Sequence, residues 1–171
     1  MITLVEPREE YLKSYMEACG EYQASGVRGY PFYDAQTQDI FEKYDNFRNE
    51  RNLPAGWVGA HYYWLVDTDK MEFIGEISIR HRLTESLKRY GGHIGYGIRF
   101  SRWNQGLGTR MLRLGLEKAK ELGISTVLIT CDDDNYASSK VMEHNGLTLQ
   151  DKILNTIDGR TFTTRRYTKT L

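Results

Sequence analysis

Two glycines, Gly106 and Gly108, lie at the start of a predicted helix. Glycine is a poor helix former, so its presence there indicates a turn or a close approach of the backbone to another group. Glycine lets a backbone approach a ligand closely, and the first amides of a helix lack partners and lie at the positive end of its dipole. The run therefore predicts a phosphate cradle, made by the unpaired main-chain N–H groups at the mouth of the helix, around Gly106 and Gly108. A plain tight turn is the alternative, because neither a Walker ending nor Gly-x-Gly-x-x-Gly is present.

A histidine begins the strand-like segment that leads into this helix. Alternation along the segment divides its residues between two faces, with Ile94, Tyr96, Ile98 and Phe100 on one and His93, Gly95, Gly97 and Arg99 on the other. The two glycines leave a bare backbone strip, which weakens a strand unless something packs closely there. Because a histidine titrates near pH ~6.5, His93 is a candidate general base. A histidine hydrogen-bonded within the sheet is the alternative.

Other side chains offer weaker chemistry. Glu76 is a second candidate base, with an exposed strand position as its alternative, and Tyr136 is a candidate acid. Tyr96 can donate a proton, but its apolar neighbours favour core packing. Cys131 is predicted to be a buried small hydrophobe rather than an acyl carrier. The acidic run 132–134 suits a helix start better than a metal or an amine.

Composition excludes several classes of protein. The 171 residues carry 23 basic and 23 acidic side chains, so no basic excess indicates a nucleic-acid binder. No charged leader precedes an apolar run, and no apolar stretch approaches the ~20 residues of a membrane span. The two cysteines, Cys19 and Cys131, have no metal-ligand spacing. We expect a cytoplasmic protein that binds no metal, membrane or nucleic acid.

The elements that must position these residues form one mixed α/β domain over residues 1–171, in the order β-α-α-β-β-β-α-β-α-β-β. The helix after Gly108 has one broad apolar arc and must lie flat on a sheet. In the third strand, Phe73, Gly75, Ile77 and Ile79 are predicted to share one face. The polar run 84–92 is predicted to be a loop. The predicted strands are 1–7, 60–68, 72–83, 93–100, 124–131, 147–156 and 160–171, and the helices are 8–24, 35–50, 107–122 and 132–146.

The segment IGYGIRFSRWNQGLGTRMLRLGLEKAKELGISTVLITCDDDNYASSKVMEHNGL resembles the acetyl-CoA-binding half of the GNAT acyltransferase superfamily. The specific match covers roughly residues 92–150 and has two parts. The first is the Gly-x-Gly turn at the helix start. The second is a later pattern met by Asn135, Ser138, Val141, Glu143, Gly146 and Leu147. IRHRL followed by GGHIGYGIR further resembles a bacterial subgroup of predicted acetyltransferases.

Two positions depart from the family pattern. Trp103 stands where relatives have Arg or Gln ahead of the glycines, and Met142 stands where many have a tyrosine acid. Backbone amides rather than the side chain before the glycines hold the phosphates, so the first departure leaves the cradle in place. The second removes the usual acid.

The resemblance implies that acetyl-CoA is a co-substrate. The pantetheine arm would pair with the strand near Ile98, Arg99 and Phe100. The pyrophosphate would be held by the main-chain N–H groups of Gln105, Gly106, Leu107, Gly108 and Thr109. Asn135 and Ser138 would contact the pantetheine or the adenosine side. His93 matches the place of a general-base Glu in some relatives.

The acceptor cleft of relatives lies between the first two helices, their connecting loop and the last hairpin. This implies contacts from Tyr30, Tyr33 and residues near Asp158. Arg80, followed by His81 and Arg82, indicates an acceptor with a carboxylate or phosphate; a basic loop that is merely solvated is the alternative.

The predicted function is an acetyl-CoA-dependent N-acetyltransferase that moves an acetyl group directly to an amine acceptor. One alternative keeps the fold and the chemistry but uses a longer acyl-CoA. Another is a domain of a different class, which binds or senses acyl-CoA without catalysis. A nucleotide-binding regulatory domain is the third choice. The identity of the amine and the pairing of two chains into a homodimer stay open.

Overall fold

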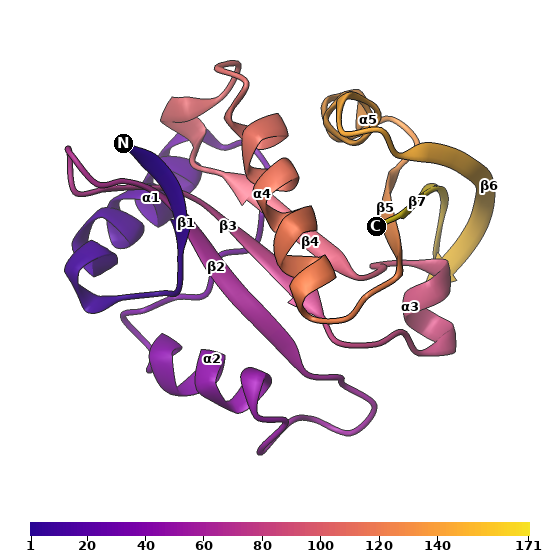
Figure 1. Cartoon of the computed structure of the whole chain (residues 1–171), viewed down its shortest axis with the longest axis horizontal. Coiled ribbons are helices and arrows are strands. Elements are labelled where there is room, and N and C mark those ends of the chain that lie inside the picture. Colours follow the sequence, from indigo (N-terminus) through magenta and orange to yellow (C-terminus); the bar gives the residue numbers. More distant parts are fainter.

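Two antiparallel sheets form the frame of the protein in a computed structural model that describes residues 1–171. They lie side by side (Figure 1). The first sheet has the order β1 (Ile2–Val5), β2 (Ala60–Asp67), β3 (Glu72–Arg80) and β4 (Ile94–Ile98). The second has the order β5 (Thr126–Asp132), β7 (Arg160–Thr170) and β6 (Thr148–Ile157). The predicted class, a mixed α/β domain with helices flanking the sheet, is confirmed. All strand pairs are antiparallel, and the sheet is divided in two.

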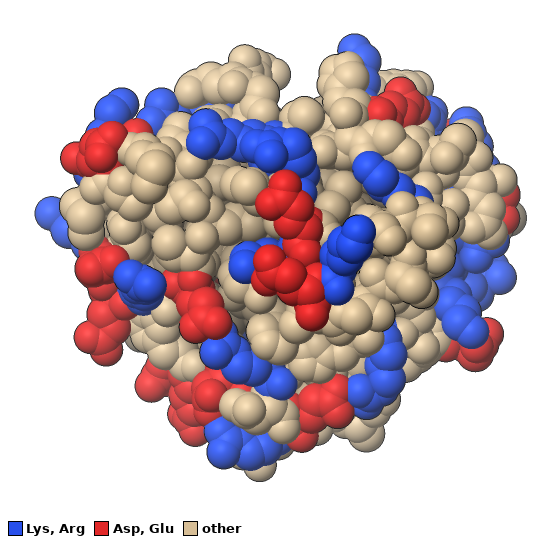
Figure 2. All heavy atoms as spheres, in the orientation of Figure 1, with Lys and Arg blue, Asp and Glu red and all other residues tan.

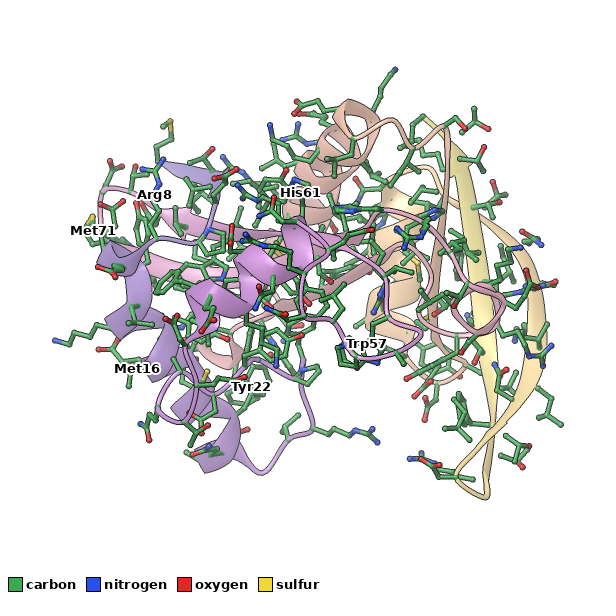
Figure 3. The ribbon with its side chains drawn as sticks, turned by 90° about the horizontal axis from the view of Figure 1, so that it is seen from below. Arg8, Met16, Tyr22, Trp57, His61 and Met71 are labelled. Carbon is green, nitrogen blue, oxygen red and sulfur yellow. The ribbon has the colours of Figure 1, made fainter.

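The helices are α1 (Leu12–Ser25), α2 (Ile40–Arg48), α3 (Glu85–Arg89), α4 (Leu107–Glu121) and α5 (Tyr136–His144), with 3₁₀ turns at Glu9–Tyr11 and Phe100–Arg102. Of these, α1 and α2 cover one face of the first sheet, α4 covers the other, and α5 packs against α4 and β5. Figure 1 shows α4 lying across one face, and Figure 3 shows α1 on the opposite side. Charges of both signs are interspersed over the α4 face (Figure 2). No helix has the length and apolar character to cross a bilayer.

One predicted loop contains a short helix. Thr84 is the N-cap of α3 and accepts a hydrogen bond from the Leu87 N–H at 3.2 Å. Glu85 lies in the first turn and Lys88 in the last, which suits the helix dipole. Local capping was enough to form one turn where the polar composition alone predicted none.

Two separate cores lie on the two faces of the first sheet. One joins β2, β3, β4 and the second sheet to α4 and α5, and the other joins β2 and β3 to α1 and α2. The prediction that Phe73 shares a face with Ile77 and Ile79 is wrong, because Phe73 lies in the α1 core and both isoleucines lie in the α4 core. The cause is a register shift between Leu65 and Val66, which leaves Ile74 as an extra residue and changes the alternation.

The two sheets meet at one isolated backbone bridge, between Gly92 and Ile129. The His93 N–H donates to the Leu128 carbonyl there at 2.7 Å. No further ladder pairs β4 with β5. The rest of β4 therefore has a strand on one side only.

Two helical glycines should respond oppositely to a side chain. A Cβ on Gly20 of α1 would meet nothing within 4 Å, so Gly20→Ala should raise the free energy of unfolding by about 0.5–1 kcal/mol. A Cβ on Gly115 of α4 would lie 2.3 Å from Ile77 Cδ1, so Gly115→Leu should lower it by about 1–3 kcal/mol. Urea denaturation of both variants measures this. A stable Gly115→Leu variant would contradict the close packing of α4 on β3.

Candidate active site

The outer edge of β4 has backbone groups that no strand pairs. The Arg80 N–H donates to the His93 carbonyl at 2.7 Å, and the Arg99 N–H to the Ile74 carbonyl at 2.8 Å. The odd-numbered residues of β4 therefore bond β3, and alternation turns the N–H and C=O groups of the even-numbered residues the other way. These groups face the space left where β4 and β5 part. An extended ligand that carries amides can pair with such an edge.

Two side chains close the end of this edge. Trp103 Nε1 donates to the Ile98 carbonyl at 2.9 Å, and the Tyr22 hydroxyl donates to the same oxygen. Figure 3 shows Tyr22 on α1. Phe100 packs against Trp103 with ring centroids 5.0 Å apart. No periodic signal in the sequence indicated this contact, since Tyr22 lies 76 residues from Ile98.

The mouth of α4 continues from the same edge. Gly106 is the N-cap with a left-handed φ of 70°, and a Cβ there would meet nothing within 4 Å. The main-chain N–H groups of residues 105–109 donate no hydrogen bond within the chain. Thus unpaired donors lie at the positive end of a 15-residue helix, and Gln105 and Gly106 among them are exposed. The arrangement suits an anion, such as a diphosphate, at the end of an extended chain.

The start of α5 faces β4 through a pair of hydroxyls. The Tyr96 hydroxyl lies 2.8 Å from Ser138 Oγ. Asn135 is the N-cap of α5, and its side-chain oxygen accepts from the Ser138 N–H at 3.1 Å. Met142 is fully buried in the α4 core. The Tyr96 hydroxyl of β4 thus reaches α5, the helix in which Met142 replaces the usual tyrosine. The apolar neighbours of Tyr96 in the sequence predicted core packing and gave no sign of this hydroxyl contact.

Arg99 lies among the predicted coenzyme-binding residues, but its side chain is turned toward α1. It is only 6% exposed, pairs with Glu21 and donates to the Phe73 carbonyl at 3.0 Å. Its guanidinium therefore fixes the end of β4 to α1. The edge is formed by the backbone of Tyr96 and Ile98.

A buried carboxylate lies on the other face of the first sheet. Glu76 is 0% exposed, and its Oε2 accepts from the Tyr44 hydroxyl at 2.6 Å and from Trp64 Nε1 at 2.9 Å. Its Oε1 has no hydrogen-bond partner. Burial raises the pKa of Glu76, and the donors from Tyr44 and Trp64 offset part of that rise. The carboxyl group is therefore held by two donors and has one oxygen free to take a proton.

The bare glycine strip lies directly beside Glu76. Gly97 is the cross-strand partner of Glu76, so both face the same side of the sheet. A Cβ on Gly97 would lie 2.0 Å from Tyr30 Cβ, which shows that Tyr30 occupies the space that the glycine leaves. The Tyr33 hydroxyl lies 3.0 Å from that of Tyr62 in the same aromatic face. The structure thus brings Tyr30, Tyr33 and Glu76 together.

His93 lies at the bridge between the sheets. Its Nδ1 accepts from the Leu128 N–H at 3.0 Å, and burial, with the nearby Arg80 charge, lowers the pKa of His93. In the neutral ring that accepts at Nδ1, the other nitrogen carries the proton. This geometry favours the alternative of a histidine held in the sheet over a base.

The remaining candidates lie apart from this group. Tyr136 is 63% exposed, with Arg165 over its ring at 5.3 Å. Cys131 is buried, and burial raises the pKa of its thiol. Arg80 donates to the Gly91 and Gly92 carbonyls at 3.1 and 2.9 Å. Its guanidinium therefore closes the turn before β4.

Comparison with known proteins agrees with this geometry. The family model described as Acetyltransferase (GNAT) domain matches residues 2–148. The chain therefore belongs to the GNAT acetyltransferases and is an acyltransferase. No curated protein matches the sequence.

Several solved structures share the fold. The acetyltransferase from Salmonella typhimurium that modifies the N-terminal serine of ribosomal protein L7/L12 is 19% identical, with 99% of this chain and 95% of that chain covered and a TM-score of 0.71. The microcin C7 self-immunity acetyltransferase MccE, in complex with acetyl-CoA and AMP, is 18% identical, with 99% and 92% covered and a TM-score of 0.70. RimL, a ribosomal L7/L12 alpha-N-protein acetyltransferase in complex with coenzyme A, is 18% identical, with 99% and 94% covered and a TM-score of 0.72.

The raised pKa of Glu76 predicts a pH dependence of stability. A carboxyl group with a raised folded-state pKa contributes stability below its unfolded value of about 4.3, and this contribution is lost as the pH rises through the folded value. Glu76→Gln keeps the size and the acceptor oxygen but does not titrate. As the pH rises from about 4.5, the parent should lose stability that the variant does not lose. The free energy of unfolding of the variant, relative to that of the parent, should therefore increase. Urea denaturation of both proteins at several pH values measures this difference. If the difference in free energy of unfolding between parent and variant stays constant with pH, Glu76 does not have a raised pKa in the folded protein.

Proposed function

We propose that this protein is an N-acetyltransferase that transfers the acetyl group of acetyl-CoA directly to an amine. The observation that carries the proposal is that two binding features follow each other along the chain. The edge of β4 up to the Ile98 N–H has no strand partner and suits the amides of pantetheine, and the free amides at the mouth of α4 suit the diphosphate. Between the two, the Ile98 carbonyl is already bonded by Trp103 and Tyr22. The CoA-bound and acetyl-CoA-bound relatives support the same ligand.

The chemistry needs a neutral amine beside the thioester. In the proposed reaction the amine nitrogen attacks the thioester carbonyl carbon, a C–N bond forms, the C–S bond breaks, and CoA leaves as a thiolate. Glu76 is the proposed base, because its free Oε1 lies on the face where β4 is bare and because burial raises its pKa, which makes its carboxylate a stronger base than an exposed one. His93 is proposed to be a positioning residue, because its Nδ1 already accepts a hydrogen bond from the Leu128 N–H.

The leaving thiolate needs a hydrogen-bond donor. The hydroxyl pair of Tyr96 and Ser138 spans the space between β4 and α5 and is proposed to supply it. Tyr136, the earlier candidate, is exposed and lies against Arg165. Tyr30 and Tyr33 are proposed to contact the acceptor from the opposite face.

A non-catalytic acyl-CoA sensor is the second reading. No specific observation favours it, because a sensor does not need a buried carboxylate with an unpartnered oxygen. The two are separated by measuring acetyl-CoA binding and amine-dependent CoA release on the same preparation. Binding without release for any amine would support the sensor, and competition by ATP would support a nucleotide-binding domain instead.

Glu76→Gln should lower kcat about 10²–10⁴-fold, as expected for the loss of a general base, while the Kd for acetyl-CoA stays within a factor of two or so. Calorimetry and a CoA-release assay measure both quantities. Tyr136→Phe is the matched control, and its kcat should equal that of the parent. A Glu76→Gln variant that folds and keeps its full turnover would remove Glu76 as the base.

A further inference from the structure

A cavity of about 390 Å³ lies outside the catalytic group, between the loop after α1, the end of α3 and the β6–β7 hairpin. Its size falls within the range of small-molecule sites. Seven residues line it: Arg28, Tyr90, Asp132, Ile157, Asp158, Arg160 and Phe162. Tyr90 and Phe162 meet edge to face with ring centroids 5.2 Å apart, so the wall contains an aromatic pair.

The charged side chains around this cavity are unpaired. Arg28, Arg160, Asp132 and Asp158 make no ion pair and no side-chain hydrogen bond. Charged side chains near them on the second sheet do have partners. Arg165 and Lys152 pair with Asp133, and Arg166 pairs with Asp151. The two arginines of the cavity are thus the cations that remain free to meet a ligand.

Two of the lining residues relate the cavity to the face of the sheet on which the proposed reaction takes place. Asp132 is the last residue of β5, and alternation along β5 puts it on the face opposite to Ile129 and Cys131, which lie in the α4 core. That is the face of Tyr30 and Glu76. Arg28 is two residues before Tyr30 in the same loop, and Arg160 projects from the start of β7. A ligand in the cavity can therefore extend toward the glycine strip.

On the basis of the proposed function, we infer that the acceptor is a small amine that carries an anionic group, a carboxylate or a phosphate, and that Arg28 and Arg160 select it. Asp132 attracts the ammonium end toward the thioester, and the two guanidinium groups hold the anionic end. Arg80, the residue that the sequence indicated for this role, is engaged with backbone carbonyls. The specificity thus comes from the loop after α1 and from the last hairpin.

Matched pairs of acceptors test the inference. Amino acids are compared with their amides, and aminoalkyl phosphates with the corresponding amino alcohols, by CoA release with saturating acetyl-CoA. We expect at least one acidic member to exceed its neutral partner by about 10-fold or more in kcat/KM. The carboxylate and phosphate arms show which anion is preferred.

Arg28→Gln and Arg160→Gln should each raise KM for that acidic acceptor about 10-fold, with kcat and the kinetics of the neutral partner unchanged. Both side chains are exposed, so neither substitution disturbs the core. Arg113→Gln on α4 is the control, because Arg113 is an exposed arginine paired only with Glu117. If neutral amines are acetylated with the same kcat/KM as the acidic ones, the inference about the acceptor is wrong, but the proposed function stands. A chain that acetylates no amine at all would overturn the proposed function on which it rests.

Discussion

The site depends on the place where β4 and β5 stop pairing. A Cβ on Gly92 would lie 2.4 Å from the Leu128 carbonyl oxygen, so only glycine allows the two backbones to meet at the bridge. Immediately afterwards the imidazole of His93 accepts the Leu128 N–H, a donor that a continuing ladder would otherwise use. A side chain thus takes the place of the next backbone partner, and the strands separate. We therefore propose that His93 affects the reaction only by keeping the two strands apart.

Because β4 has no partner beyond the bridge, its free backbone edge and its glycine face are available for different contacts. Its outward backbone groups and the amides of α4 are the groups proposed to bind an extended, anionic coenzyme. The glycine face leaves room for Tyr30 and, behind it, for Glu76, which α1, α2 and their aromatic residues keep away from water. A single strand therefore separates the proposed thioester from the proposed base. Two strand spacings of about 4.8 Å each then put the backbone of Glu76 about 10 Å from the proposed coenzyme strand, a gap that the Glu76 side chain and the amine have to bridge.

Much of this architecture follows from local sequence pattern. The amphipathic α4, its glycine mouth, the buried β5 and the Asp-Gly hairpin are each determined by residues that are neighbours in the chain, so their order was predicted correctly. The segment proposed to bind the coenzyme could be singled out for the same reason, since its glycines and the helix they precede lie within a few residues of each other. Only the five-residue α3 was missed among the helices.

The remaining features depend on contacts between distant residues. The partners of Glu76 are 12 and 32 residues away, so a carboxylate in an apolar strand could be recognised but its burial could not. The same holds for the Tyr22 hydroxyl on the Ile98 carbonyl and for the cavity that joins Arg28 to Arg160. The bulge at Ile74 moved Phe73 to the other core because one extra residue reverses alternation, which periodicity alone does not reveal.

Hydrogen exchange resolved at single amides tests the central claim most directly. The account predicts that saturating acetyl-CoA slows exchange of the Tyr96 and Ile98 amides of β4 and of the first-turn amides of α4, by about 10-fold or more, while exchange on the exposed face of β6 stays the same. Unchanged exchange at β4 and α4 in the presence of saturating acetyl-CoA would contradict the account.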